Sequence, residues 1–155
     1  MRNGSELTLF AVLVDHQMWQ TLKPPLIILG WAASDAAVVL AAIFHGLLLP
    51  QYHGTLDTYS TTIAAYLGLL GIAVLAALVI GDFATTIVSF FASYLLAMAM
   101  TYLVLVLPGY TGALPSPEVI ISAAVVFTFD AFFPIPLLIE FVGSLVGLGL
   151  SERLM

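Results

Sequence analysis

Apolar residues fill four long stretches of the chain, and polar residues gather between them. The stretches are Leu26–Leu49, Ser60–Ile80, Phe83–Leu107 and Ile120–Leu150. As helices that rise 1.5 Å per residue, the first three are about 32–38 Å long, and the hydrocarbon core of a bilayer is about 30 Å thick. The pattern therefore predicts three helices that cross the membrane with some tilt.

The fourth stretch is too long for one crossing, because a straight helix of its length measures about 46 Å. Pro134 and Pro136 lie near its middle. Each proline lacks the N–H that a helix needs and clashes with the carbonyl four residues earlier. We expect a broken or strongly kinked helix, Ile120–Phe133 followed by Ile135–Leu150. Two separate crossings are the alternative, but segments this short span a bilayer poorly.

The first 23 residues differ from the rest of the chain. Between Glu6 and Leu22, apolar residues are mixed with charged and amide side chains. This mixture favours an interfacial helix that lies along the lipid headgroups, and we expect Lys23-Pro24-Pro25 to end it. The chain then divides into a cytoplasmic or interfacial segment, residues 1–23, and a transmembrane bundle, residues 24–155.

Composition agrees with an all-α integral membrane protein, a bundle of about four transmembrane helices. Hydrophobic residues make up 62% of the 155 residues and charged residues 8%, whereas a soluble domain carries roughly 25% charged residues. Three basic residues against nine acidic ones give a net charge of −6. Because nucleic-acid surfaces need clustered Lys and Arg to neutralise phosphates, this balance excludes a nucleic-acid partner.

The three basic residues predict the orientation of the bundle. Arg2 and Lys23 precede the first helix and Arg153 follows the last, while the loops Pro50–Tyr59 and Pro108–Pro117 contain neither Lys nor Arg. By the positive-inside rule, both termini then lie in the cytoplasm and both long loops outside. Four crossings of the cell membrane satisfy this arrangement.

Three acidic residues lie inside the apolar stretches: Asp35, Asp130 and Glu140. Counting along straight helices puts Asp35 and Asp130 about 14–15 Å deep, near the midplane, and Glu140 nearer the cytoplasmic face. A carboxylate at the bilayer centre costs roughly 2.5–3.5 kcal/mol, and no Lys or Arg occurs between Lys23 and Arg153. Three interpretations stay open: neutral carboxyls that hydrogen-bond helices together, pairing with another subunit's cation, or an ion or proton path.

Small residues recur at spacings of three and four in all four stretches. Small side chains let helix backbones approach each other closely, and hydroxyls can hydrogen-bond across the contact. We therefore expect helix-packing faces at these positions. They are Gly30, Ser34, Ala37 and Ala41 in the first stretch, Ala73 and Ala77 in the second with Gly81 directly after it, Thr86, Ser89, Ser93, Ala97 and Thr101 in the third, and Gly143 and Gly147, a G-x-x-x-G motif, in the fourth.

Catalytic signatures are missing from the sequence. It contains no G-x-S-x-G, H-E-x-x-H, P-loop or dinucleotide-binding motif, and it has no cysteine. His45 is the only histidine inside an apolar stretch, so this chain does not supply two axial histidines to a haem. We expect no enzymatic activity, no catalytic or metal-binding residue and no cofactor.

Two hypotheses of function follow from these observations. The first is a non-enzymatic multi-pass membrane subunit that packs within a larger membrane protein complex, with the lipid bilayer and other integral membrane subunits, or further copies of itself, as partners. The alternative is a small ion- or proton-coupled transport protein that uses the carboxyls of Asp35, Asp130 and Glu140.

Overall fold

A computed structural model describes the backbone of residues 4–45, 56–111 and 117–154, and the side chains of residues 23–45, 62–111 and 117–154. Throughout these ranges the regular structure is helical. The five helices are α1 (Gly4–Phe44), α2 (Leu56–Ile80), α3 (Phe83–Tyr110), α4 (Pro117–Phe132) and α5 (Ile135–Leu154).

Four helical segments are long and apolar enough to cross a membrane: Lys23–Phe44, Thr62–Ile80, Phe83–Tyr110 and Ile135–Leu154. Their outward faces carry large apolar side chains such as Leu75, which is mostly exposed. Water would penalise such a surface, whereas lipid tails match it. The prediction of an all-α, multi-pass membrane protein is therefore confirmed.

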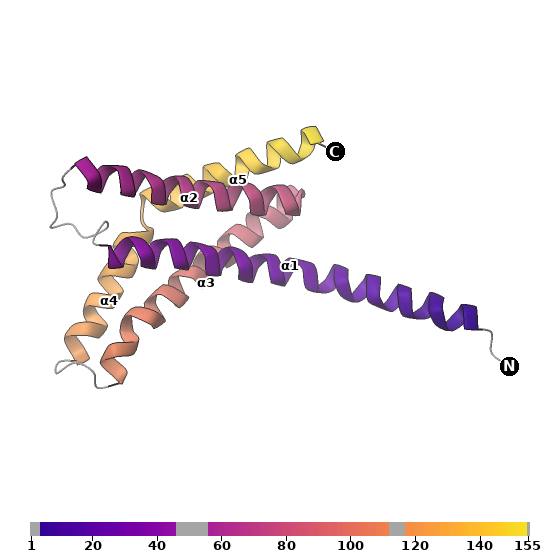
Figure 1. Ribbon diagram of the computed structural model, residues 1–155, viewed down its shortest axis with the longest axis horizontal. Helices are drawn as coiled ribbons and strands as arrows, with labels where there is room; N and C mark the ends of the chain where they lie inside the picture. The colour runs from indigo at the N-terminus through magenta and orange to yellow at the C-terminus, as the bar shows by residue number, and fades with distance from the viewer. Residues whose placement is uncertain (1–3, 46–55, 112–116, 155) are drawn as a thin grey trace.

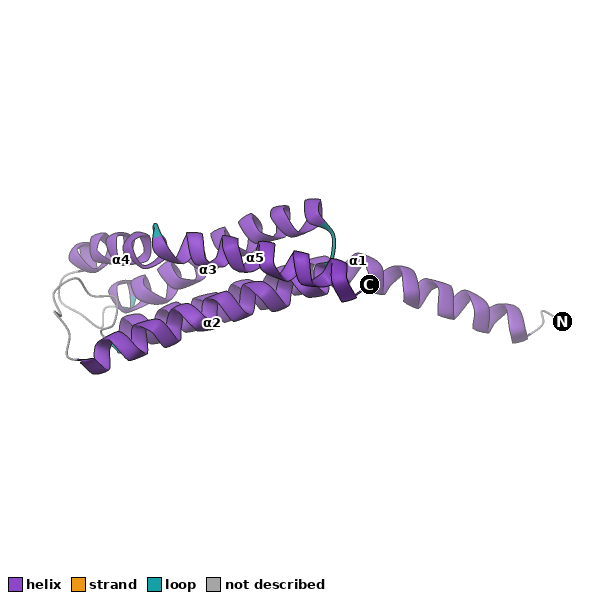
Figure 2. Cartoon of the chain, turned by 90° about the horizontal axis from the view of Figure 1, so that it is seen from above, coloured by secondary structure: helices purple, strands orange, loops and turns teal. Residues whose placement is uncertain are grey.

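The helices form a bundle with its ends on two sides (Figures 1 and 2). Both described termini and the turn between α2 and α3 lie at one end, and the last turns of α1 and α3 lie at the other, with the first turns of α2 and α4. The closest helix pairs are α2 with α5, α1 with α3, and α3 with α4. An even number of crossings follows from this arrangement, with α4 and α5 together completing the fourth.

The fourth crossing is broken where the prolines predicted it. α4 ends at Phe132 and α5 begins at Ile135. Phe133 N–H still donates to the Phe129 carbonyl (2.9 Å), and Leu138 N–H donates to the Pro134 carbonyl (3.2 Å). Helical hydrogen bonding therefore stops after the first of these bonds and resumes with the second, so the two segments take different directions (Figure 1).

Two predicted helix ends are wrong. α1 runs through Pro24 and Pro25 without interruption, and α3 continues past Pro108 to Tyr110. Proline has a helical φ, and its cost arises from the lost N–H and from the crowded carbonyl one turn earlier. Near a membrane surface, water and headgroups can satisfy such carbonyls. The placement of residues 1–23 along the headgroups remains a prediction.

The turn between α2 and α3 takes only two residues. Gly81 has a φ of 72°, a conformation that costs glycine little because it has no Cβ. Asp82 caps α3, because its carboxylate accepts hydrogen bonds from the Thr85 N–H (2.8 Å) and hydroxyl (2.6 Å). The tight turn reverses the direction of the chain between α2 and α3 at this end of the bundle, and the two helices diverge from it (Figure 1).

α2 and α5 make the closest approach in the bundle, with the small-residue ridges of these two helices facing each other. The packing face predicted on the first stretch is wrong, because all four of its residues are exposed: Gly30, Ser34, Ala37 and Ala41. A Cβ added at Gly143 would lie 2.9 Å from the Leu70 carbonyl oxygen, and one at Gly147 would collide with the Val74 carbonyl. Ala73 and Ala77 fill the remaining space. Lipid offers no hydrophobic force between helices, so such close contact is a main source of their attraction.

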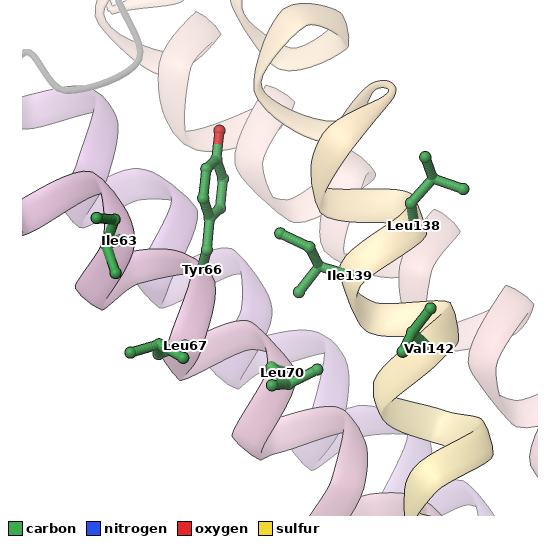
Figure 3. Close-up of a pocket in the computed structure, with 7 residues that line it drawn as sticks. All are labelled: Ile63, Tyr66, Leu67, Leu70, Leu138, Ile139 and Val142. Atoms are coloured by element: carbon green, nitrogen blue, oxygen red, sulfur yellow. The ribbon is translucent and has the colours of Figure 1, made fainter. Parts of the chain in front are cut away.

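Farther along the same pair, α2 and α5 separate and leave a hollow of about 400 Å³. Tyr66 and Ile139 extend into the gap between the helices (Figure 3). The hollow exists because the chain turns at the break, so α4 packs on α3 and makes no close contact with α2. Its lining is almost wholly apolar: Ile63, Tyr66, Leu67, Leu70, Leu138, Ile139 and Val142.

Candidate functional site

Two carboxyl groups lie side by side in the interior of the bundle. Asp35 of α1 and Glu140 of α5 are both 0% exposed. The carboxyls lie close enough to interact directly. Among the described residues, none of their four oxygens makes a hydrogen bond of ordinary geometry. This pair is the most costly polar feature of the bundle, because buried charges need partners.

The pair lies deep in the membrane-spanning region. Asp35 follows the start of its span at Lys23 by twelve residues, and Glu140 precedes the end of its span at Leu154 by fourteen. At 1.5 Å per residue these separations are about 18 and 21 Å along the helices, more than half of a core about 30 Å thick. Lys23 and Arg153 lie at the far ends of these spans, about 18 and 20 Å away along the helices. No Lys or Arg stands between them in the sequence, so no basic side chain of the spans can pair with either carboxyl.

Tyr94 of α3 lies beside the pair. Its hydroxyl is within electrostatic reach of both Asp35 and Glu140, and it donates a hydrogen bond to the Phe132 carbonyl at the end of α4. In a regular helix that carbonyl would accept from residue 136, which here is a proline without an N–H. Tyr94 therefore supplies the donor that the break removes.

Tyr94 belongs to a cluster of aromatic rings in the core. The Phe90 ring lies 6.1 Å from Trp31 and 5.7 Å from Phe141, measured between ring centroids, and the Tyr94 ring lies 5.3 Å from Phe132. The Trp31 Nε1–H is also buried without a partner in the described part of the chain. The site is thus a small polar cluster inside an apolar wall, where electrostatic interactions are strong.

The small polar stripe of α3 faces the interior. All five of its residues are buried, and Phe90 and Tyr94 lie on the same side of the helix. The Ser93 hydroxyl donates to the Phe90 carbonyl of its own helix (3.0 Å), and on α5 the Ser144 hydroxyl donates to the Glu140 carbonyl (2.8 Å). These two hydroxyls are satisfied locally and leave the carboxyl pair without donors. The stripe comprises Thr86, Ser89, Ser93, Ala97 and Thr101.

Asp130 does not join the site. It lies on the exposed side of α4, while Thr128 and Ala131 face the interior. The expectation that Glu140 lies nearer the end of the bundle than Asp35 is wrong, because the structure brings these two carboxyls together. The depth of Asp130 stays a prediction. The count along one straight helix failed because α4 and α5 run in different directions on either side of the break (Figure 1).

Sequence reasoning missed Tyr94 and Trp31. An aromatic residue in an apolar stretch resembles ordinary core, and nothing local distinguishes these two. A signal did exist for Tyr94, because Pro136 leaves a carbonyl without its usual donor and buried carbonyls need one. A hydroxyl was therefore required near Phe132, and the polar face of α3 was the place to seek it.

The arrangement is suited to holding protons. When two adjacent, fully buried carboxyls are both ionised they repel each other, so a proton shared between them stabilises the pair. The described residues contain no group of three or more His, Cys, Asp or Glu side chains that could hold a metal ion. No family model, characterised protein or solved structure shows a significant match to this chain, so function is argued from the site.

Proposed function

We propose that this chain is a small proton-coupled transport protein of the cell membrane, with both termini cytoplasmic. The Asp35–Glu140 pair would bind and release the coupling proton. The observation that carries this proposal is the full burial of two adjacent carboxyls with no basic side chain in reach. Such intramembrane carboxyls are expensive, and they commonly mark proton relays in pumps and transporters.

The broken fourth crossing supports the same function. Coupling-ion sites in transporters are commonly built where a helix is discontinuous near the midplane. Glu140 lies in α5, five residues after its first residue, and Tyr94 links the site to the end of α4. A site that lies against a hinge can change its access when the hinge moves.

Proton flux into vesicles tests the proposal. The purified protein is reconstituted into liposomes that contain a pH-sensitive dye, and a pH gradient is imposed with a potassium ionophore present to balance charge. We expect flux above that of protein-free vesicles, and a loss of at least about tenfold in Asp35→Asn and Glu140→Gln, since general acid–base groups contribute about 10²–10⁴-fold to the proton transfers they mediate.

Glu118→Gln serves as the matched control, because Glu118 is an exposed carboxyl in the first turn of α4 and should keep wild-type flux. The amide side chains in Asp35→Asn and Glu140→Gln preserve the size and most of the hydrogen-bonding capacity of the carboxyls, so these two variants should assemble normally. Flux no greater than in empty vesicles for the wild type, or wild-type flux in both Asp35→Asn and Glu140→Gln, would overturn the proposal.

A second candidate function, a non-enzymatic subunit of a larger membrane complex, is favoured by Asp130. This carboxyl lies on the outward face of α4 beside Phe129, which is also exposed. Facing lipid tails, a carboxylate near the bilayer centre costs roughly 2.5–3.5 kcal/mol. A neighbouring subunit with a basic side chain would offset that cost.

Co-purification in mild detergent tests this second function. If another chain pairs with Asp130, Asp130→Asn should release it, because the partner's charge is left buried and unpaired at about 3–5 kcal/mol. Glu118→Gln should keep it. Recovery of the wild-type protein alone, or as copies of itself, would count against the complex.

A further inference from the structure

The Tyr94 hydroxyl stands between two acceptors of different kinds. One is the Phe132 carbonyl, to which it donates. The other is the carboxyl pair, since both Asp35 and Glu140 lie within its electrostatic reach. A hydroxyl has a single proton to donate, so a strong bond to one acceptor weakens the bond to the other.

One of the two acceptors belongs to the helix break between α4 and α5, and the other belongs to the proposed proton site. Phe132 is the last residue of α4, and its carbonyl depends on Tyr94 because Pro136 has no N–H to offer. The charge of the carboxyl pair depends on whether its proton is bound. Tyr94 thus hydrogen-bonds to the helix break and interacts electrostatically with the proton site.

We propose that Tyr94 is a positioning residue that couples the proton occupancy of the Asp35–Glu140 pair to the angle between α4 and α5. The proposal rests on the proposed function, since it assumes that the pair gains and loses a proton. It adds the path by which that event would move part of the bundle.

While the pair is fully protonated, the Phe132 carbonyl competes well for the tyrosine proton, and the bond at the break is kept. When one proton leaves, the remaining carboxylate becomes the stronger acceptor, because hydrogen bonds to ionised groups are roughly twice as strong as neutral ones. Tyr94 then turns to the carboxylate and keeps its own proton. The Phe132 carbonyl loses its donor, and the break adjusts until another donor or water reaches it.

Few other ionisable groups face Tyr94. α1 contributes Asp35 and α5 contributes Glu140, while Arg153 lies at the exposed far end of α5. On α2, Tyr66 lines the outward hollow between α2 and α5 (Figure 3). On α4, Asp130 is exposed on the outer side. The carboxyl pair is therefore the group whose titration this hydroxyl senses.

Distance measurements between α4 and α5 test the coupling. Since the sequence contains no cysteine, single cysteines at Val125 and Val146, both exposed, can carry spin labels without background. Double electron–electron resonance on the full chain in lipid nanodiscs should give different label distances at acidic and alkaline pH. Tyr94→Phe should lose this shift, whereas Tyr102→Phe, a matched change on α3, should keep it.

Two further variants separate the possible failures. Asp35→Asn combined with Glu140→Gln should hold the acidic-pH distance at every pH. Pro136→Ala, which restores a backbone donor for the Phe132 carbonyl, should also remove the shift, and it tests the coupling even if Tyr94→Phe fails to fold. A wild-type distance that ignores pH, or a wild-type shift in either Tyr94→Phe or Pro136→Ala, would overturn the coupling. Loss of proton flux in the carboxyl variants would still support the transport function in that case.

Discussion

At residues 143 and 147, the carbonyls of another helix occupy the space in which a side chain would begin. A Cβ at Gly143 would meet the Leu70 carbonyl oxygen, and a Cβ at Gly147 would meet the Val74 carbonyl oxygen, in both cases closer than real Cβ atoms come. Backbone atoms cannot rotate away as the tip of a flexible side chain can. Glycine is therefore required at both positions for steric reasons.

Gly143→Ala and Gly147→Ala should each destabilise the bundle by about 1–3 kcal/mol, the usual cost of overpacking a core. Gly147→Ala should be the more harmful, because its Cβ would come closest to backbone. Thermal unfolding in detergent, followed by circular dichroism, measures the effect. Gly149→Ala is the control: nothing lies within 4 Å of its Cβ, so it should be neutral or slightly stabilising. Equal effects at 147 and 149 would contradict this account.

A functional residue could be predicted where the free-energy cost of burying it can be inferred from the sequence alone. Asp35, Asp130 and Glu140 stand out because an apolar stretch without Lys or Arg provides no basic side chain to offset the cost of burying a carboxylate. Which two would meet was not predictable, because that depends on how α1 and α5 pass α3. Tyr94 was missed for a related reason: its acceptor is a carbonyl of another helix.

Among the elements, the turn into α3 is held by one exposed carboxylate. Hydrogen bonds from the Thr85 hydroxyl and N–H hold the pKa of Asp82 below its usual value. A depressed pKa means that the folded state favours the ionised form. The stabilisation is then fully present above the unfolded pKa, about 4, and is lost as the pH falls through the lower folded value.

Asp82→Asn should therefore flatten the acid limb of the stability profile. Asparagine still accepts from the Thr85 N–H and is a good N-cap, but it does not titrate. Melting temperatures measured in one detergent between neutral pH and about pH 3 should fall less steeply in this variant than in the wild type. Thr85→Val, which keeps the N–H donor and removes the hydroxyl, should lie between the two. Parallel profiles for Asp82→Asn and wild type would exclude a role for the carboxylate.

Local signals predicted some helix boundaries well and others badly. Gly81-Asp82 marks a turn by glycine and N-cap chemistry alone, so the end of α2 and the start of α3 were correct to the residue. Pro24-Pro25 and Pro108 were misleading, because proline's φ is helical and a membrane surface can satisfy the carbonyls it exposes. Pro134 and Pro136 do break the helix, because two N–H donors are missing within a single turn.

For the whole molecule, the fold determines which segments share an end of the bundle, and the basic residues predict which end faces the cytoplasm. The helices bring Asp82 to the same end as both described termini, and Thr111 to the opposite end (Figure 1). Lys23 and Arg153 then predict that the first end is cytoplasmic. Thr55, also in a predicted outer loop, falls outside the described residues.

Single cysteines can test this orientation in intact cells. Cysteine at Thr55 or Thr111 should react with a membrane-impermeant maleimide added outside, and cysteine at Asp82 should react only after permeabilisation. The wild-type chain, which contains no cysteine, gives the background. The reverse pattern would invert the orientation, and labelling of Thr55 and Thr111 from opposite sides would rule out four crossings.

The close contact between α2 and α5 also has a consequence for biosynthesis. Val74 and Gly147 are 73 residues apart, and α3 and α4 must emerge between them. At about 5–20 residues per second, the ribosome needs roughly 4–15 seconds to cover that distance. During this time the small-residue ridge of α2 meets only lipid or other nascent helices. The length of α3 and α4 therefore sets how long α2 stays open to a wrong partner before α5 arrives.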